Sequence, residues 1–331
     1  RRHTRYGTVT GGQTCALPIC ATSVQLTLTA RTDYAGPLLP DAARTPDPEA
    51  AARADQSRAF AALLYEPARA TAPSCTLSLG PRDRRSVPTA QRLRELAQGT
   101  ADPDLFATYF AYGRYLLASS SREGSLPANL QGLWAAEYQT PWNGDYHLDI
   151  NVQMNYWPAL TTNLIPSHEP LVRLIESLVA PGERTAKAYY QAPGWVAHVI
   201  TNAWGFTSPG EHASWGATNS GSGWLCRHLW EHYAFAQDRA FLQRIYPTLK
   251  GSAEFYLATL VPEPSHGWLV TGVSNSPEYA FRTQDGQIAN VCMGPTMDQQ
   301  IVRELFGNCI DRKSTRLNSS HSSVSRMPSS A

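Results

Sequence analysis

The sequence predicts a mainly α-helical protein, arranged as a toroid of helical hairpins with its functional site built from loops at one end. Apolar residues recur at helical spacing in several segments, and long loops rich in aromatic residues and glycine separate these segments. Loops longer than about 15 residues inside a compact domain usually carry function. A simple helical bundle would have shorter connections.

The N-terminal part of the chain is predicted to be a strand followed by a linker. Residues 24–32 (VQLTLTART) alternate apolar and polar side chains, which is typical of a strand. Residues 37–56 are rich in proline, alanine and aspartate, and this composition indicates a linker that runs into a helix.

The clearest helix is predicted at residues 103–118. Leu105, Tyr109, Tyr112 and Leu116 follow helical spacing, and the ADPD sequence at its start is a good helix start. Further helices are predicted at 168–180, 183–191, 219–236 and 239–260, the last with Asp238 as its N-cap, and a strand is predicted at 266–274.

The two ends of the chain have no hydrophobic period and do not fit their neighbours. TVTGGQTCALPI at the start and DRKSTRLNSSH at the end resemble translations of the two strands of a sequencing adapter, with Gly12 where the adapter would give Val. Residues 1–19 and 311–331 are therefore expected to be adapter-derived and are excluded from the prediction of the fold. The remaining residues, 20–310, are expected to be an internal piece of a longer protein.

Composition favours a folded protein and gives no sign that the protein binds nucleic acid or a membrane. Of the 331 residues, 42% are hydrophobic and 17% are charged. The formal charge of +1 gives no reason to expect nucleic acid or an anionic membrane as a partner. No apolar run approaches the about 18–20 residues that a membrane span needs. The six cysteines include no CxxC pair, so neither a zinc ribbon nor a dense disulfide framework is expected.

The stretch HLDINVQMNYWPA (147–159) combines polar and apolar residues in an unusual way. In HLDIN, extended backbone would place His147, Asp149 and Asn151 on one face and the intervening apolar side chains on the other. Polar groups in an apolar setting must be hydrogen-bonded, or each costs about 1–3 kcal/mol. The pattern predicts either a face that receives a sugar or a buried polar network that ties loops together.

The second candidate is Glu278 in the sequence VSNSPEYAF. A carboxylic acid in a partly apolar pocket has a raised pKa, because burial disfavours its charged form. Such a group suits general acid catalysis at neutral pH. By itself the residue could equally be a loop glutamate that caps a helix.

The third candidate is HLWEH, His228 to His232. On a helix, residues i and i+4 share a face, so both histidines could bind one metal ion, as in the HxxEH pattern of zinc peptidases. A third protein ligand would have to come from elsewhere, and a packed aromatic helix explains the pattern equally well. Nearby, Glu211 and Trp224 lie in or just after a Gly/Ser-rich loop that could line a pocket.

Six motifs resemble, in order, glycoside hydrolase family 95, the α-1,2-L-fucosidase family with some α-L-galactosidase members. The resemblance covers about Leu77 to Phe306. The motifs are YGRYLLASSSREGSLPANLQGLW, WNGDYHLDINVQMNYWPALTTNL, GWLCRHLWEHY, YPTLKGSAEFYL, LVTGVSNSPE and GPTMDQQIVRELF.

The resemblance implies an (α/α)6 barrel behind an N-terminal β-sandwich. Residues 20–99 would then be the end of the β-rich region and a linker, and residues 100–310 the N-terminal half of the barrel. It also implies that the protein hydrolyses a fucosylated glycan with inversion at the anomeric carbon. No metal ion or other cofactor is implied. In inverting enzymes the acid and the water-activating group lie about 6.5–9.5 Å apart.

Site residues follow from the resemblance position by position. Glu278 of SPE matches the general acid, and Asn151 matches one of two asparagines that orient the attacking water. Asp149 stands where the family pattern has the other asparagine. His147 matches a sugar-binding histidine, while Glu211 and Trp224 are weaker pocket candidates.

Two departures from the family pattern have consequences. Asp149 in place of asparagine implies either a changed sugar preference or a local carboxylate that shares the role of the base. The family's base aspartate lies well downstream, near a His-rich segment, and is not found in this chain. About half of the barrel would also be missing, which would expose an apolar seam, so the chain alone is expected to be poorly stable and inactive.

Three alternatives remain open at the level of sequence. The first is an α-L-galactosidase, whose sugar differs from fucose by one hydroxyl at C6 and is only modestly discriminated by a pocket not built to hydrogen-bond that group. The second is a non-catalytic carbohydrate-binding protein. The third is a zinc hydrolase that uses HLWEH.

Overall fold

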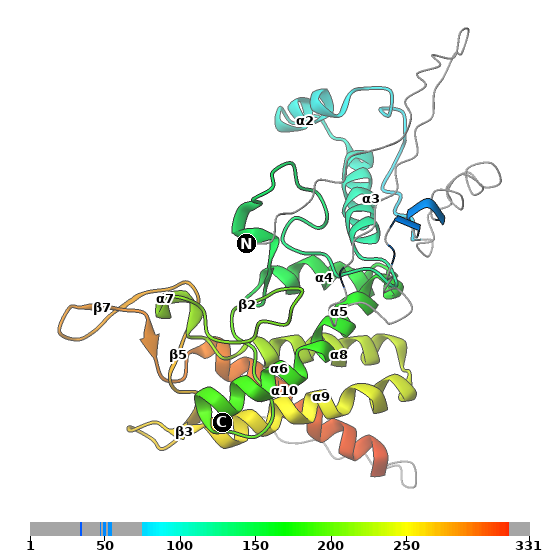
Figure 1. Ribbon diagram of the computed structural model, residues 1–331. Helices are drawn as coiled ribbons and strands as arrows, with labels where there is room; N and C mark the ends of the chain where they lie inside the picture. The colour runs from blue at the N-terminus through cyan, green and yellow to red at the C-terminus, as the bar shows by residue number, and fades with distance from the viewer. Residues whose placement is uncertain (1–33, 35–46, 48, 51, 55–74, 318–331) are drawn as a thin grey trace. The chain divides into compact units, whose positions relative to one another are not determined.

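The computed structural model describes residues 34, 47, 49–50, 52–54 and 75–317. The chain divides into two compact units, of which the second comprises residues 34–44 and 70–331 and contains every element discussed below. The described part is mainly helical, as predicted (Figure 1). The strand predicted at 24–32 and most of the linker predicted at 37–56 lie outside the described residues.

Helix α3 (Pro103–Ser120) confirms the clearest sequence prediction and extends two residues beyond it. The side chain of Asp102 caps its start by accepting a hydrogen bond from the Leu105 N–H at 3.1 Å. Helix α2 (Thr89–Ala97), which was not predicted, is tied to this start because Arg92 donates to the Asp102 carboxylate at 2.7 and 2.8 Å. A buried ion pair, rather than an apolar stripe, thus joins the two helices.

The predicted extended conformation of HLDIN is wrong. The chain is extended only in strand β1 (Tyr146–His147), which pairs antiparallel with β2 (Ile200–Thr201). It then turns over residues 148–150 and begins helix α4 (Asn151–Thr161). The Leu148 N–H donates to the Val199 carbonyl at 2.7 Å, and its side chain is fully buried. Of the two apolar residues in HLDIN, Leu148 lies in the core and Ile150 is half-buried, and the helix starts directly after the turn.

The helices predicted at 168–180 and 183–191 appear with shifted boundaries. They correspond to α5 (Ile165–Ser177), α6 (Val179–Thr185) and a π-helical turn, η3 (Ala186–Tyr190). Because Pro166 stands in the first turn of α5, where a missing N–H leaves no hydrogen bond unmade, the helix starts three residues earlier than its apolar period suggested.

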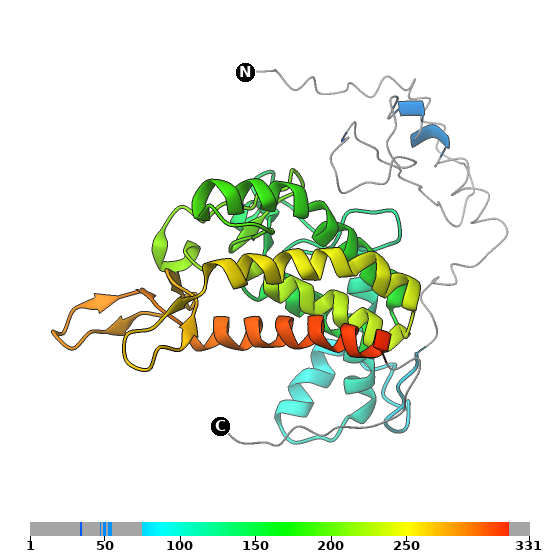
Figure 2. The same ribbon diagram turned by 90° about the horizontal axis from the view of Figure 1, so that it is seen from below.

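Helices α8 (Gly221–Ala236) and α9 (Arg239–Thr259) confirm two further predictions and are joined by a two-residue connection. The predicted cap is also confirmed, since the Asp238 carboxylate accepts hydrogen bonds from the N–H groups of Ala240 and Phe241 at 2.8 and 3.2 Å. Helix α10 (Thr296–Leu317) packs against both (Figures 1 and 2). It continues into the segment that was set aside as adapter-derived.

Short strands connect α9 to α10. The strand predicted at 266–274 is confirmed in part: the range contains β4 and the first residue of β5, which are separated by residues 271–273 and pair with different strands. Three antiparallel pairs form: β3 (Val261–Pro262) with β4 (Leu269–Val270), β5 (Ser274–Asn275) with β8 (Val291–Cys292), and β6 (Phe281–Arg282) with β7 (Ile288–Ala289).

The hydrophobic core lies among α4, α5, α8 and α9. Trp195 is its largest fully buried side chain, and its indole N–H donates to the Thr248 carbonyl at 2.8 Å. The four described cysteines are free; Cys226 is buried, whereas Cys75, Cys292 and Cys309 are only partly buried. Within the described residues, no helix combines the length and the apolar character needed to cross a membrane.

Candidate functional site

His147 and Asp149 lie where β1 ends and the chain turns toward α4. The pairing of His147 with Ile200 and the bond from Leu148 to Val199 hold this turn against the segment before β2. His147 Nε2 and Asp149 Oδ1 are both buried without a hydrogen-bond partner. Buried polar atoms are nearly always paired, so two orphan atoms two residues apart indicate a place for a polar ligand or water.

Asp149 has an unusual electrostatic environment. Burial raises the pKa of its carboxyl above the usual range, the bond to its own backbone N–H and the charge of His147 oppose this rise, and the charge of Glu278 adds to it. A negative charge nearby disfavours the charged form of a carboxyl group, which is the effect of Glu278 on Asp149. Asp149 and Glu278 are 129 positions apart in sequence, and the fold brings their charges within electrostatic reach.

Glu278 lies in the loop between β5 and β6 and is exposed. The partly apolar pocket expected around it is not formed by the described residues. Its loop is nevertheless held at its base, because Asn275 pairs with Val291 of β8 and its side-chain amide donates to the Ser214 carbonyl at 2.9 Å. Ser214 belongs to the short helix α7 (Ala213–Gly216), so the loop is attached to α7 as well.

Asn151 is the first residue of α4 and is half-buried. It follows Asp149 by two residues at the junction of turn and helix, so the two side chains are not on one extended face as predicted.

Glu211 and Trp224 are less closely tied to this cluster. Trp224 is half-buried in the first turn of α8, whose start packs against the segment before β2, with the Ser222 N–H donating to the Ala197 carbonyl at 3.2 Å. Glu211 is exposed two residues before α7. Within the described residues, neither side chain is hydrogen-bonded to His147, Asp149, Asn151 or Glu278, whereas the charges of His147 and Glu278 both act on Asp149.

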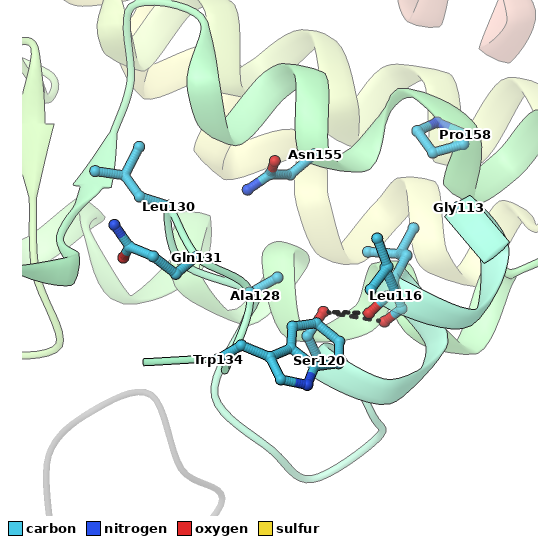
Figure 3. A pocket seen from close by; sticks show the side chains of 11 residues that line it. Gly113, Leu116, Ser120, Ala128, Leu130, Gln131, Trp134, Asn155 and Pro158 are labelled. Carbon is cyan, nitrogen blue, oxygen red and sulfur yellow. Dashed lines mark hydrogen bonds between the residues drawn. The ribbon is translucent and has the colours of Figure 1, made fainter. Parts of the chain in front are cut away.

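A separate hollow of about 330 Å³ lies between α3, the loop 128–134 and α4 (Figure 3). None of the six predicted site residues lines it. Gln131, Trp134 and Asn155 do, and the Asn155 amide donates to the Asn129 carbonyl at 2.9 Å. Asn155 lies one helical turn after Asn151, so the hollow begins on α4 next to the candidate site rather than at it.

The histidines of HLWEH are packed inside the helices. His228 and His232 on α8 are 2% and 7% exposed, and His232 Nδ1 lies 3.1 Å from Nδ1 of the fully buried His168 on α5. His232 also stacks on Phe241 at 4.1 Å between ring centroids. Across the part of the chain that the structure describes, no group of three or more His, Cys, Asp or Glu residues is placed to hold a metal ion. The packed-helix interpretation fits this arrangement.

Three residues around the Glu278 loop were not singled out from the sequence. Ser274, Asn275 and Asp298 are each fully buried. The first two stand in VSNSPE and the third in GPTMDQQ, so polar residues inside apolar or turn-forming segments were the available signal. Each carries a buried oxygen without a hydrogen-bond partner: Ser274 Oγ, Asn275 Oδ1 and Asp298 Oδ1.

Comparison with known proteins adds independent information. A family model described as the glycosyl hydrolase family 95 catalytic domain matches residues 65–330. The chain is 42% identical over 229 residues to alpha-L-fucosidase 2 of Arabidopsis thaliana, an alignment that covers 69% of this chain and 27% of the relative. It is 38% identical over 241 residues to a probable alpha-fucosidase A of Aspergillus niger, covering 71% of this chain and 30% of the relative. The chain thus spans less than a third of the length of these two curated relatives.

Proposed function

Because the chain belongs to the glycosyl hydrolase family 95 catalytic domains, we propose that the protein that carries it hydrolyses terminal α-L-fucosides, with α-1,2 linkage, from glycans. The relatives' names, alpha-L-fucosidase and probable alpha-fucosidase, support the choice of sugar. The residues most directly involved are Glu278, Asp149 and Asn151, with His147 as a contact to the sugar.

One observation carries this proposal: the charge of Glu278 acts on Asp149, whose pKa is also raised by burial. Hydrolysis with inversion needs a proton donor on one side of the anomeric carbon and a water-orienting group on the other. We assign Glu278 to the first role and Asp149 with Asn151 to the second. The orphan atoms His147 Nε2 and Asp149 Oδ1 supply hydrogen-bonding capacity for sugar hydroxyls or the attacking water.

In the proposed reaction, the Glu278 proton passes to the glycosidic oxygen as its bond to the anomeric carbon breaks. Water attacks that carbon from the opposite face and loses its own proton to a base. We propose that this base lies in a part of the complete protein outside this chain, and that the chain alone does not turn over. We further propose that the bound sugar and that missing part cover Glu278, which is exposed here.

We also propose that the helices at residues 100–310 form the first half of an (α/α)6 barrel. The antiparallel pair α8 and α9, joined by two residues, supports this because hairpins of this kind are the repeating unit of such a barrel. Glu211 and Trp224 would then lie on the pocket's edge.

The decisive experiment replaces Glu278 by Gln in the complete protein and measures release of fucose from a 2′-fucosylated oligosaccharide. Loss of a general acid is expected to lower kcat by about 10²–10⁴-fold. Glu254→Gln is the matched control, because Glu254 lies on α9 and is ion-paired with Lys250 at 3.0 Å at the surface. A Glu278→Gln variant that turns over at the control's rate would remove the assignment.

The same assay separates the alternatives. An α-L-galactosidase would release L-galactose faster than fucose from matched substrates. That result would change the proposed substrate but not the proposed roles of Glu278, Asp149 and Asn151. A carbohydrate-binding protein would bind the fucosylated glycan without turnover in its unmodified form, and Glu278→Gln would then change nothing.

A further inference from the structure

A buried polar cluster lies beneath the loop that carries Glu278. Its centre is Asp298, in the first turn of α10, whose side chain has no solvent exposure. Asp298 Oδ2 accepts a hydrogen bond from the Thr271 hydroxyl at 2.8 Å. The hydroxyls of Ser274 and Ser220 also lie close enough to stabilise the carboxylate, although Asp298 Oδ1 and Ser274 Oγ complete no hydrogen bond of good geometry.

The position of these hydroxyls along the chain is informative. Thr271 and Ser274 flank the two residues at which the chain passes from β4 to β5, and Glu278 follows Ser274 by four residues. One carboxylate therefore contacts both ends of the segment that leads into the Glu278 loop. The Gly294 N–H donates to the Thr271 carbonyl at 2.7 Å, which adds a backbone tie between this segment and the start of α10.

The buried carboxyl of Asp298 is expected to lower the stability of the fold. Burial raises the pKa of the Asp298 carboxyl above its usual range. Within the described ranges, no Lys, Arg or His lies within ion-pair distance of it. A buried carboxyl without a cationic partner destabilises a fold, and an apolar side chain at this point of α10 would be more favourable for stability alone. Side chains retained against stability are frequently those that orient a functional group.

We propose that Asp298 is a positioning residue for Glu278: by holding Thr271 and Ser274, it sets the place of the β5–β6 loop from which Glu278 donates its proton. The role rests on the proposed function, because it presupposes that Glu278 is the acid. It differs from that function in its location, since Asp298 touches neither the substrate nor the reacting atoms.

A positioning residue for the acid has a signature that a general structural residue lacks. Proton donation matters most when the leaving group is a sugar hydroxyl and least when it is an acidic phenol, which leaves without help. Misplacing Glu278 should therefore slow hydrolysis of a fucosylated saccharide much more than hydrolysis of p-nitrophenyl α-L-fucoside. Loss of folded enzyme would lower both rates by the same factor.

The test uses the complete protein and the variants Asp298→Asn and Thr271→Val. For both, we expect kcat on a 2′-fucosylated oligosaccharide to fall by at least about tenfold, kcat on the p-nitrophenyl substrate to fall by less than about threefold, and KM to stay within about twofold. Thr271→Ser should restore the saccharide rate, since it returns the hydroxyl to Asp298. Asp285→Asn, in the exposed turn between β6 and β7, is the matched control.

Each outcome bears on one claim. Equal losses on both substrates, or no loss on either, overturn the positioning role. If Asp298→Asn fails to fold, judged by circular dichroism and thermal melting, the Thr271 pair decides the question in its place. Glu278→Gln is measured in parallel: if it shows no contrast between the two substrates, the proposed function fails, whereas a contrast for Glu278→Gln but not for the Asp298 and Thr271 variants rejects only the present inference.

Discussion

Among the buried polar clusters of the described residues, two contain residues that the sequence offered as candidate sites: His147 and Asp149 in one, and His228 and His232 in the other. The first lies at the loops around His147 and Asp149, and the second comprises His168, His228 and His232 between α5 and α8. Both contain buried nitrogen or oxygen atoms without hydrogen-bond partners. They differ in what surrounds them.

The loop cluster lies next to an exposed charged loop, whereas the charges that act on the histidine cluster come from the helices packed around it. Asp149 is half-buried and feels the charge of Glu278, which reaches it from a separate, exposed loop. The histidines are enclosed by helices, and burial lowers the pKa of His228 to about 3. A ligand needs access to the polar groups, and of these two clusters only the loop cluster offers it, because the histidines are 0–7% exposed. The comparison teaches that orphan polar atoms indicate a site only when solvent can reach their surroundings.

The largest effect on activity is expected from substitution of Asp149 in the loop cluster. In the complete protein, Asp149→Ala should lower kcat/KM for a fucosylated oligosaccharide by about 100-fold, because the water loses an orienting group, which corresponds to about 2.7 kcal/mol of transition-state stabilisation. Asp149→Asn should stay within about tenfold of the unmodified protein, since an amide keeps the hydrogen-bonding geometry. Steady-state kinetics measure both.

The pH profile adds a second readout for Asp149. Because its pKa is raised above the usual range, it gains its charge at a higher pH than an ordinary aspartate. If that charge assists the base, activity rises with pH as Asp149 ionises, and in Asp149→Asn this acidic limb moves to lower pH. An Asp149→Ala variant with unchanged kcat/KM would reduce the cluster to a packing network.

The next prediction concerns the histidine cluster and stability. In the unfolded chain, His228 takes up a proton near pH 6.5, whereas in the fold it stays neutral down to about pH 3 because of burial and, less strongly, the charge of Arg227. The unfolded state therefore binds more protons between these values, and stability falls as pH decreases below 6.5. At pH 5 the loss should be about 2 kcal/mol from this one residue.

Replacement of His228 by Asn should remove that contribution. The variant is expected to be less stable at pH 7.5 but to lose about 2 kcal/mol less between pH 7.5 and pH 5, measured by urea unfolding at both values. His266→Asn is the control, since the His266 side chain is 60% exposed. Identical pH dependence in His228→Asn and the unmodified protein would contradict the buried, neutral state of this imidazole.

The smallest effect is expected for Asp238, which belongs to neither cluster. Asp238 caps α9 by accepting two backbone N–H hydrogen bonds. Asp238→Ala should lower the free energy of unfolding by about 1 kcal/mol, with kcat/KM unchanged. Thermal melting and the fucose-release assay check the two halves of this statement, and a clear loss of activity would indicate that α9 is coupled to the loop site.

The helices were predictable where local signals were strong. Asp102 and Asp238 each begin a helix whose apolar spacing follows directly, and both capping carboxylates are observed in contact with backbone N–H groups. Helix α2 was not predicted in this way, because its buried contact is made by Arg92 with the carboxylates of Asp102 and Asp104, whereas its Leu93 is exposed. The extended HLDIN was predicted wrongly because alternation over five residues also fits a strand end followed by a turn and a helix.

The residues of the candidate site also divide into those that the sequence identified and those that only the structure revealed. Sequence motifs identified His147, Asp149, Asn151 and Glu278, because polar and ionisable side chains in unusual surroundings can be recognised in the sequence. Asp298 was not, because its significance depends on its contact with Thr271, 27 positions away.

The sequence by itself determined the helical class, two capped helix starts and the membership of a hydrolase family, because periodicity, caps and motifs act over short stretches of chain. Only the tertiary structure decided which polar residues share an environment. It brought the charge of Glu278 to Asp149, enclosed the three histidines and placed Asp298 beside the segment that leads into the Glu278 loop. Burial and electrostatic reach are properties of distances between segments, and these distances exist only after the helices have packed.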